Sequence, residues 1–162
     1  MTILVTPDAA SMSITGMGSR SMPAERKAES LAQIKRDPIF IASHWKDSDV
    51  FFHAAGTEKV GDVQARIVDV SVEGTALRWF VDPQSGHILK QTYRTVGQSG
   101  APAEGETTME NWKSIAGLTL PVLRKNKQNG DESSVAEYTA IELNPTVDPK
   151  IFDKPADDQK AQ

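Results

Sequence analysis

From Asp49 onward, short runs of apolar and β-branched residues alternate with turn residues, the pattern of an antiparallel series of strands. Glu73-Gly74, Asn129-Gly130 and the run 82–86 combine side-chain acceptors with glycine, as tight turns require. No run is followed by a helix long enough for a parallel crossover. The predicted strands are residues 50–55, 64–72, 75–81, 88–95, 107–112, 118–125 and 133–143, with 56–61 as a turn region and 96–105 as an exposed loop.

The first part of the chain has a different pattern, which predicts a weak hairpin followed by helices. Residues 3–6 and 12–15 suit two short strands separated by a turn. Ser21 can cap a helix and Pro23 suits its first turn, so residues 24–35 predict one helix. Asp37 and Pro38 can start another, which is short, almost entirely apolar and covers 39–45.

Side-chain alternation indicates that both faces of the sheet carry bulk. Leu77, Trp79 and Val81 point to one face, whereas Arg78 and Phe80 point to the other. A curved sheet whose concave face is covered explains this better than a sheet with one solvent-exposed face. The sequence therefore predicts an α+β fold, mainly β, with a curved antiparallel sheet and a helical segment at 23–45.

Composition adds limits on partners and location. The chain has 162 residues, close to one domain, with 38% hydrophobic and 25% charged residues and a net charge of -4. The two charge signs are interspersed, so nucleic-acid binding is not expected. There is no cysteine, no apolar run long enough for a transmembrane segment, and no leader pattern in residues 1–10.

The usual catalytic patterns are missing from the sequence. The three histidines, His44, His53 and His87, have no metal-ligand spacing, so neither a metal nor another cofactor is expected. His53 lies within a predicted strand and is the one histidine to test for burial. No serine lies in a G-x-S-x-G pattern, and the acidic run 104–110 suits a solvated face better than paired catalytic carboxylates. The sequence therefore predicts that the protein is not an enzyme.

The remaining candidates for a functional site are large apolar and aromatic side chains. The plain interpretation is a hydrophobic core, whereas the alternative is a cleft between sheet and helices in which an acyl chain or apolar peptide lies. The candidate ligand-binding residues are Phe40, Ile41 and Trp45 in the helical segment, and Trp79, Tyr93, Met109, Trp112 and Leu120 on the strands.

Several short stretches together resemble a known family. They are VG at 60–61, WFVD at 79–82, SGHILK at 85–90, GLTLP at 117–121, Asn144 and FDKP at 152–155. With them the chain resembles the outer-membrane lipoprotein-sorting protein superfamily, the fold of LolA-like periplasmic lipoprotein carriers. The resemblance implies an incomplete β-barrel with a helical lid, here 23–45, on the concave side of the sheet.

The resemblance also implies a domain over residues 1–155, and the polar residues 156–162 predict a disordered tail. It implies a periplasmic or cell-envelope location and a non-catalytic domain that binds an apolar ligand, either a lipid or the acyl chain of a lipoprotein. The family's opening helix and first strands do not fit before Met22. This departure suggests the later part of a longer envelope protein. The alternative is therefore a structural or interaction domain that packs against other domains of a parent chain and binds no small molecule.

Overall fold

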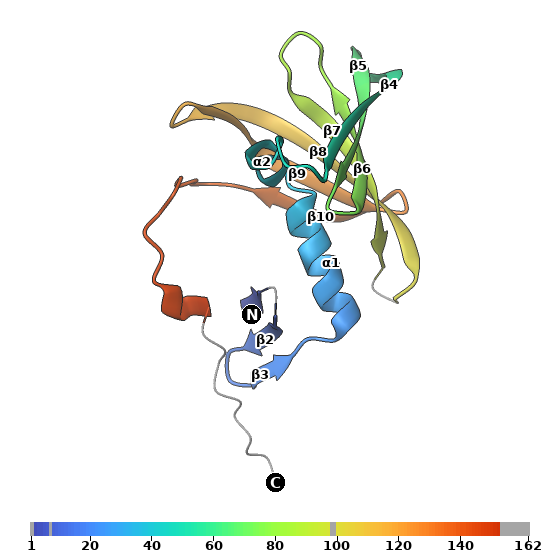
Figure 1. Ribbon diagram of the computed structural model, residues 1–162. Helices are drawn as coiled ribbons and strands as arrows, with labels where there is room; N and C mark the ends of the chain where they lie inside the picture. The colour runs from blue at the N-terminus through green and yellow to red at the C-terminus, as the bar shows by residue number, and fades with distance from the viewer. Residues whose placement is uncertain (1, 7, 98–99, 153–162) are drawn as a thin grey trace. The chain divides into compact units, whose positions relative to one another are not determined.

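The computed structural model describes residues 2–6, 8–97 and 100–152 (Figure 1). The chain packs as two compact units. The larger unit is Lys35–Leu143, and the smaller unit combines Met1–Ile34 with Asn144–Gln162. The single domain predicted over residues 1–155 stays a prediction, and the predicted tail at 156–162 lies outside the described residues.

A seven-stranded antiparallel sheet forms most of the larger unit (Figure 1). Its order is β10-β9-β8-β7-β6-β5-β4, so each strand pairs with its neighbour in sequence. This confirms the predicted antiparallel arrangement, because short turns leave no room for a crossover. The strands are β4 (Val50–Val60), β5 (Val63–Val72), β6 (Thr75–Val81), β7 (Ile88–Val96), β8 (Pro102–Ile115), β9 (Leu118–Gln128) and β10 (Asp131–Glu137).

The turns follow the residues that predicted them. Asn129 and Gly130 have φ of 53° and 91°, and this pair of positive values is what a tight hairpin turn needs. Asp82 accepts hydrogen bonds from the Gln84 backbone N–H at 2.9 Å and from the Ser85 hydroxyl at 2.6 Å. The bond from Ser85 lowers the pKa of Asp82. Asp82 is therefore a turn-forming residue, as predicted.

The strand predicted over 133–143 ends at Glu137. Two further predictions are wrong because irregular strand residues resemble turns in the sequence. Residues 56–60 continue β4, and Gly56 lies with φ of 108° where the register with β5 shifts. A bulge of this kind often contains glycine, as a turn does. Residues 102–105, predicted as a loop, form antiparallel pairs with residues 93–96 of β7. Ala103 is 6% exposed and Gly105 is buried, so the two small residues are covered strand positions.

The sheet curves around α2 (Pro38–Ser43) and the two residues before it. Ile41 belongs to a core cluster with Val50 of β4 and Leu77 of β6. Asp37 reaches β9, where Arg124 donates a hydrogen bond to its carboxylate at 2.8 Å. Five strand steps separate β4 from β9, about 24 Å on a flat sheet. A short segment contacts both only if the sheet bends, so the α2 face is concave (Figure 1).

The opposite, convex face has a smaller core and a ladder of charges. Ala65, Ile67 and Phe80 are buried there. Lys90 lies over the Phe80 ring, with its Nζ 4.1 Å from the ring centroid and 3.8 Å from Glu106. Such cross-strand pairs on an accessible face contribute little stability each but keep the surface polar. Each glutamate of the acidic run 104–110 forms an ion pair with a basic residue of a neighbouring strand.

One convex pair gives a pH prediction. The hydrogen bond from Arg78, 2.6 Å from its Nε to Oδ1, holds the pKa of Asp69 below its ordinary value. A depressed pKa in the folded state contributes stability at higher pH, and this contribution is lost as pH falls through the folded pKa. We expect Asp69→Asn to flatten the acid-side decline of unfolding free energy, by a small amount because both side chains are accessible. Urea titrations from about pH 6 to about pH 2 would measure it; identical slopes for both proteins would contradict it.

The smaller unit contains a three-stranded antiparallel sheet with β1 (Thr2–Val5), β2 (Ala10–Ile14) and β3 (Gly18–Ser21). The predicted hairpin is confirmed, and β3 is a strand that the sequence interpretation missed. α1 (Ala24–Lys35) has the predicted bounds, and a 3-10 turn, η1, covers Pro149–Phe152. Among the described residues, no helix is both long and apolar enough to cross a membrane.

Candidate functional site

The helical segment on the concave face is fixed at its start by charged groups. One carboxylate oxygen of Asp37 accepts the Ile39 backbone N–H at 2.8 Å and caps α2, and the other accepts from Arg124 of β9. Arg36 is 5% exposed, lies 4.3 Å above the Tyr93 ring and donates to the Arg94 carbonyl at 3.2 Å. Stacking and the ion pair together pin α2 to β7 and β9.

The helix contributes its apolar side to the main core. Ile41 is fully buried, and Phe40 packs against the same cluster while remaining partly accessible. The cluster also contains Val70, Val72 and Leu77, with Trp79 and Tyr93 beside it. The part of the predicted lid that covers the concave face is therefore α2, and it is a packed element of the core.

Beyond α2 the concave face continues as a half-covered apolar strip, defined here as Phe52, Val68, Trp79 and Val81. The register places them together, because Phe52 pairs with Val70, and Val68 with Trp79. The Phe52 and Trp79 rings lie 6.0 Å apart. Phe52 is 46% exposed on edge strand β4, whereas the other three are half-buried. The strip is therefore a partly accessible apolar surface that continues from the core.

Polar groups border the strip on its inner side. The Trp79 indole N–H donates to the Gln91 amide oxygen at 3.3 Å. Gln91 is 6% exposed and Thr107, on the next strand, is 4% exposed. The Thr107 hydroxyl donates to Asn126 at 2.8 Å and lies 3.3 Å from the Tyr93 hydroxyl. These hydrogen bonds fix the Trp79 and Tyr93 side chains, so the apolar surface is preformed.

The predicted site residues do not all share this surface. Ile41, Phe40, Trp79 and Tyr93 meet in one cluster. Alternation along β9 and its pairing with β8 place Leu120 and Met109 on the same concave face, 7% and 2% exposed. They lie in the core farther across the sheet.

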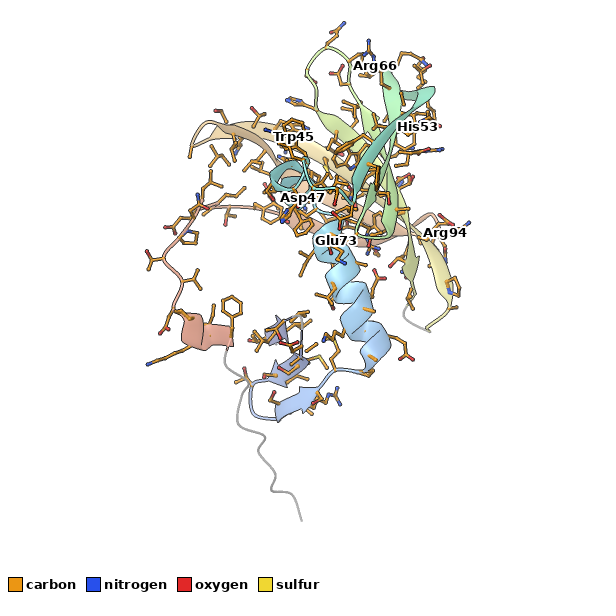
Figure 2. The ribbon with its side chains drawn as sticks, in the orientation of Figure 1. Trp45, Asp47, His53, Arg66, Glu73 and Arg94 are labelled. Carbon is orange, nitrogen blue, oxygen red and sulfur yellow. The ribbon has the colours of Figure 1, made fainter. Side chains whose placement is uncertain are left out.

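Two predicted tryptophans lie elsewhere. Trp45 follows α2, is 58% exposed and has the Lys46 ammonium 4.9 Å from its ring centroid (Figure 2). The helix predicted over 39–45 ends at Ser43, so Trp45 lies beyond α2 and is not covered by the sheet. Trp112 pairs with Pro121, a position that alternates with Leu120 and so faces the other side. There it stacks on His87 at 4.3 Å.

His53 is also exposed, although its strand position made burial conceivable (Figure 2). It pairs in register with Asp69 on the convex face of edge strand β4. Its neighbour Phe52 is the candidate site residue that the sequence interpretation missed. The available signal was the alternation of side chains along this strand. Phe52 lies two residues from Val50, before the bulge in β4, so the two side chains are on the same face.

The described part of the chain has no group of three or more histidine, aspartate or glutamate side chains that could hold a metal ion. The concave face itself offers amides, hydroxyls and one pinned ion pair beside apolar carbon.

Comparison with known proteins finds one similar solved structure. No protein-family model matches the chain, and no curated protein matches it by sequence. The chain is similar to a structure described as a putative outer membrane lipoprotein-sorting protein domain from Vibrio parahaemolyticus. The match has a TM-score of 0.44 and 14% identity, and it covers 84% of this chain and 62% of that one. That description names the superfamily that the sequence resembles.

Proposed function

We propose that the larger unit is a non-catalytic binding domain that holds an apolar ligand along the strip beside α2. The ligand class is a lipid or the acyl chain of a lipoprotein. The observation that carries this proposal is Phe52, a 46% exposed aromatic that extends the concave apolar surface past the pinned helix. A location in the cell envelope goes with the proposal and rests on the family resemblance of turns and strands.

The shape of the site supports an extended apolar ligand. Val68, Trp79 and Val81 are half-buried, so an occupant would cover carbon that is still accessible while the core beneath stays intact. Because hydrogen bonds already orient Trp79, little side-chain ordering is needed on binding. Preorganisation of this kind favours affinity for ligands that have few polar groups of their own.

A second function, docking against another protein domain, is favoured by Phe51. This side chain is 62% exposed on the convex side of the same edge strand. Two phenylalanines on opposite faces of an edge strand suit a protein surface that wraps that edge. A ligand confined to the concave face would leave Phe51 untouched, so the two functions make different predictions.

Contact quenching of tryptophan tests the proposal. We expect a monoacylglycerol with a brominated chain to quench the Trp45→Phe/Trp112→Phe protein, in which Trp79 remains on the strip. The matched control is Trp45→Phe/Trp79→Phe, in which Trp112 remains on the opposite face. Equal quenching of both proteins, or quenching of neither, would reject the concave strip as the ligand site.

A further inference from the structure

The inner border of the apolar strip contains a nearly buried side-chain amide, that of Gln91 in β7. Gln91 is 6% exposed and pairs with the strip residue Trp79, so both lie on the concave face. Its Oε1 accepts the indole N–H of Trp79 at 3.3 Å. An indole nitrogen only donates, so this contact fixes which end of the amide is the oxygen. The Nε2 group, with its two N–H donors, is therefore the end turned away from the indole.

The Nε2 donors of Gln91 have no acceptor within the described residues. The side-chain nitrogens that are fully enclosed there without a partner are Trp112 Nε1 and Arg124 Nε, so Gln91 Nε2 keeps an opening to its surroundings. Nearly buried amides normally have their donors satisfied, either by the protein or by a bound molecule. Accessible donors on an otherwise covered side chain therefore indicate a place for a ligand acceptor.

The neighbouring polar groups are already bonded to one another. The Thr107 hydroxyl donates its proton to Asn126 Oδ1 at 2.8 Å, so its contact of 3.3 Å with the Tyr93 hydroxyl uses the tyrosine proton. The Asn126 amide nitrogen donates to the Ser134 hydroxyl at 3.0 Å. These donors stay within the network, whereas the Gln91 Nε2 donors are available to an occupant of the strip.

An available donor at this border selects a ligand that carries an acceptor. An acyl ester offers a carbonyl oxygen and has no donor of its own at that end of the chain. An N-acyl amide would bring an N–H group to a border where the oxygens of Gln91, Thr107 and Asn126 already accept. A few placed polar groups beside apolar carbon are the usual means by which a site orients its ligand.

We propose that Gln91 is a specificity-determining residue that donates a hydrogen bond from Nε2 to the ester carbonyl of an acyl lipid. The assignment rests on the function proposed above and adds the position of the ligand's polar group. The carbonyl lies at Gln91, and the chain follows the strip from Trp79 towards Phe52. The site then distinguishes an acyl ester from an alkyl ether, because the ether has no carbonyl oxygen.

Paired titrations with monododecanoylglycerol and the dodecyl ether of glycerol, both below their aggregation concentrations, test the assignment. Both ligands are uncharged, and they differ at the carbonyl. We expect the original protein to bind the ester about fivefold more tightly, the net value of one neutral hydrogen bond. Gln91→Met keeps a side chain of similar length without a donor, so it should bind the two ligands alike.

Gln64→Met is the matched control variant. Gln64 is exposed on β5, and its Nε2 already donates to the Thr57 hydroxyl at 3.0 Å. This variant should keep the preference of the original protein for the ester. A near-UV circular dichroism spectrum equal to that of the original protein shows that Gln91→Met is folded.

Side-chain amide NMR of the original protein gives a second readout that does not depend on any variant. The ester should move the Gln91 Nε2 proton signals downfield, as a hydrogen bond to a carbonyl does, and the ether should not. The Gln64 signals should stay in place with both ligands. If Gln91→Met does not fold, these spectra decide the assignment.

Equal affinity of the original protein for ester and ether would overturn the role of Gln91 while leaving the apolar strip as proposed. A preference that persists in Gln91→Met, or Gln91 amide signals that do not respond to the ester, would also overturn it. Tighter binding of an N-dodecanoyl amide than of the ester would overturn the choice of an ester. Binding of neither glycerol lipid would reject the proposed function and this assignment together.

Discussion

Replacing Ile41 by alanine is expected to destabilise the larger unit by roughly 2 to 5 kcal/mol, the range for a buried aliphatic side chain that leaves a cavity. Ile41 is 0% exposed and lies in one cluster with Val70, Val72 and Leu77. Because the start of α2 is pinned at Asp37, the helix can shift only a little to fill the void, and we expect a value within this range.

Ile39 on the same helix provides the matched control. It is 46% exposed, so Ile39→Ala removes the same atoms with little loss of burial and should change stability by no more than about 0.5 kcal/mol. Urea unfolding followed by tryptophan fluorescence reports on the larger unit, since all three tryptophans lie in it. Similar losses for both variants would contradict the packing of α2 on the sheet.

Gly105→Ala is the second substitution expected to have a large effect. A Cβ at this position would lie 2.3 Å from Cε2 and 2.7 Å from Cζ of Tyr93, whose ring covers the glycine from the neighbouring strand. The ring would have to move, and with it the stacking of Arg36 and the contact with Thr107. Overpacking of this kind typically costs roughly 1 to 3 kcal/mol.

A double-mutant cycle separates this clash from a backbone effect. In a Tyr93→Ala background the obstacle is gone, and Gly105→Ala should then be neutral or slightly stabilising, because alanine restricts the unfolded chain more than glycine. The measured quantity is the difference in unfolding free energy between the two backgrounds. Additive losses would show that Tyr93 does not lie over Gly105.

The strand order followed directly from the sequence because turn chemistry is local. Glu73-Gly74 and Asn129-Gly130 mark hairpins with no knowledge of the rest of the fold, and both pairs have positive φ in the structure. Residues 102–105 are the converse case. Gly105 is a residue type common in loops, yet here it lies in a strand. The ring of Tyr93, on the neighbouring strand, occupies the space above it that a side chain would need. Tertiary context of that kind is invisible along the chain.

The site was harder to predict because its candidate residues share a large apolar side chain but not one face of the sheet. Alternation from Met109 places Trp112, three residues further on, on the other face of the sheet, where it pairs with Pro121. Trp45 lies only two residues beyond the end of α2, and no periodicity says where so short a helix stops. Phe52 could have been found by extending the alternation of β4 to its pairing with β5.

The most direct test of the proposed function compares two phenylalanines on one strand. Phe52 lies on the concave strip and Phe51 on the convex side, and both are exposed. In titrations with a neutral monoacylglycerol, Phe52→Ala should weaken binding about tenfold, the loss expected for one buried aromatic contact. Phe51→Ala should bind as the original protein does. Unchanged affinity in Phe52→Ala, or a loss caused only by Phe51→Ala, would contradict a ligand site on the concave face.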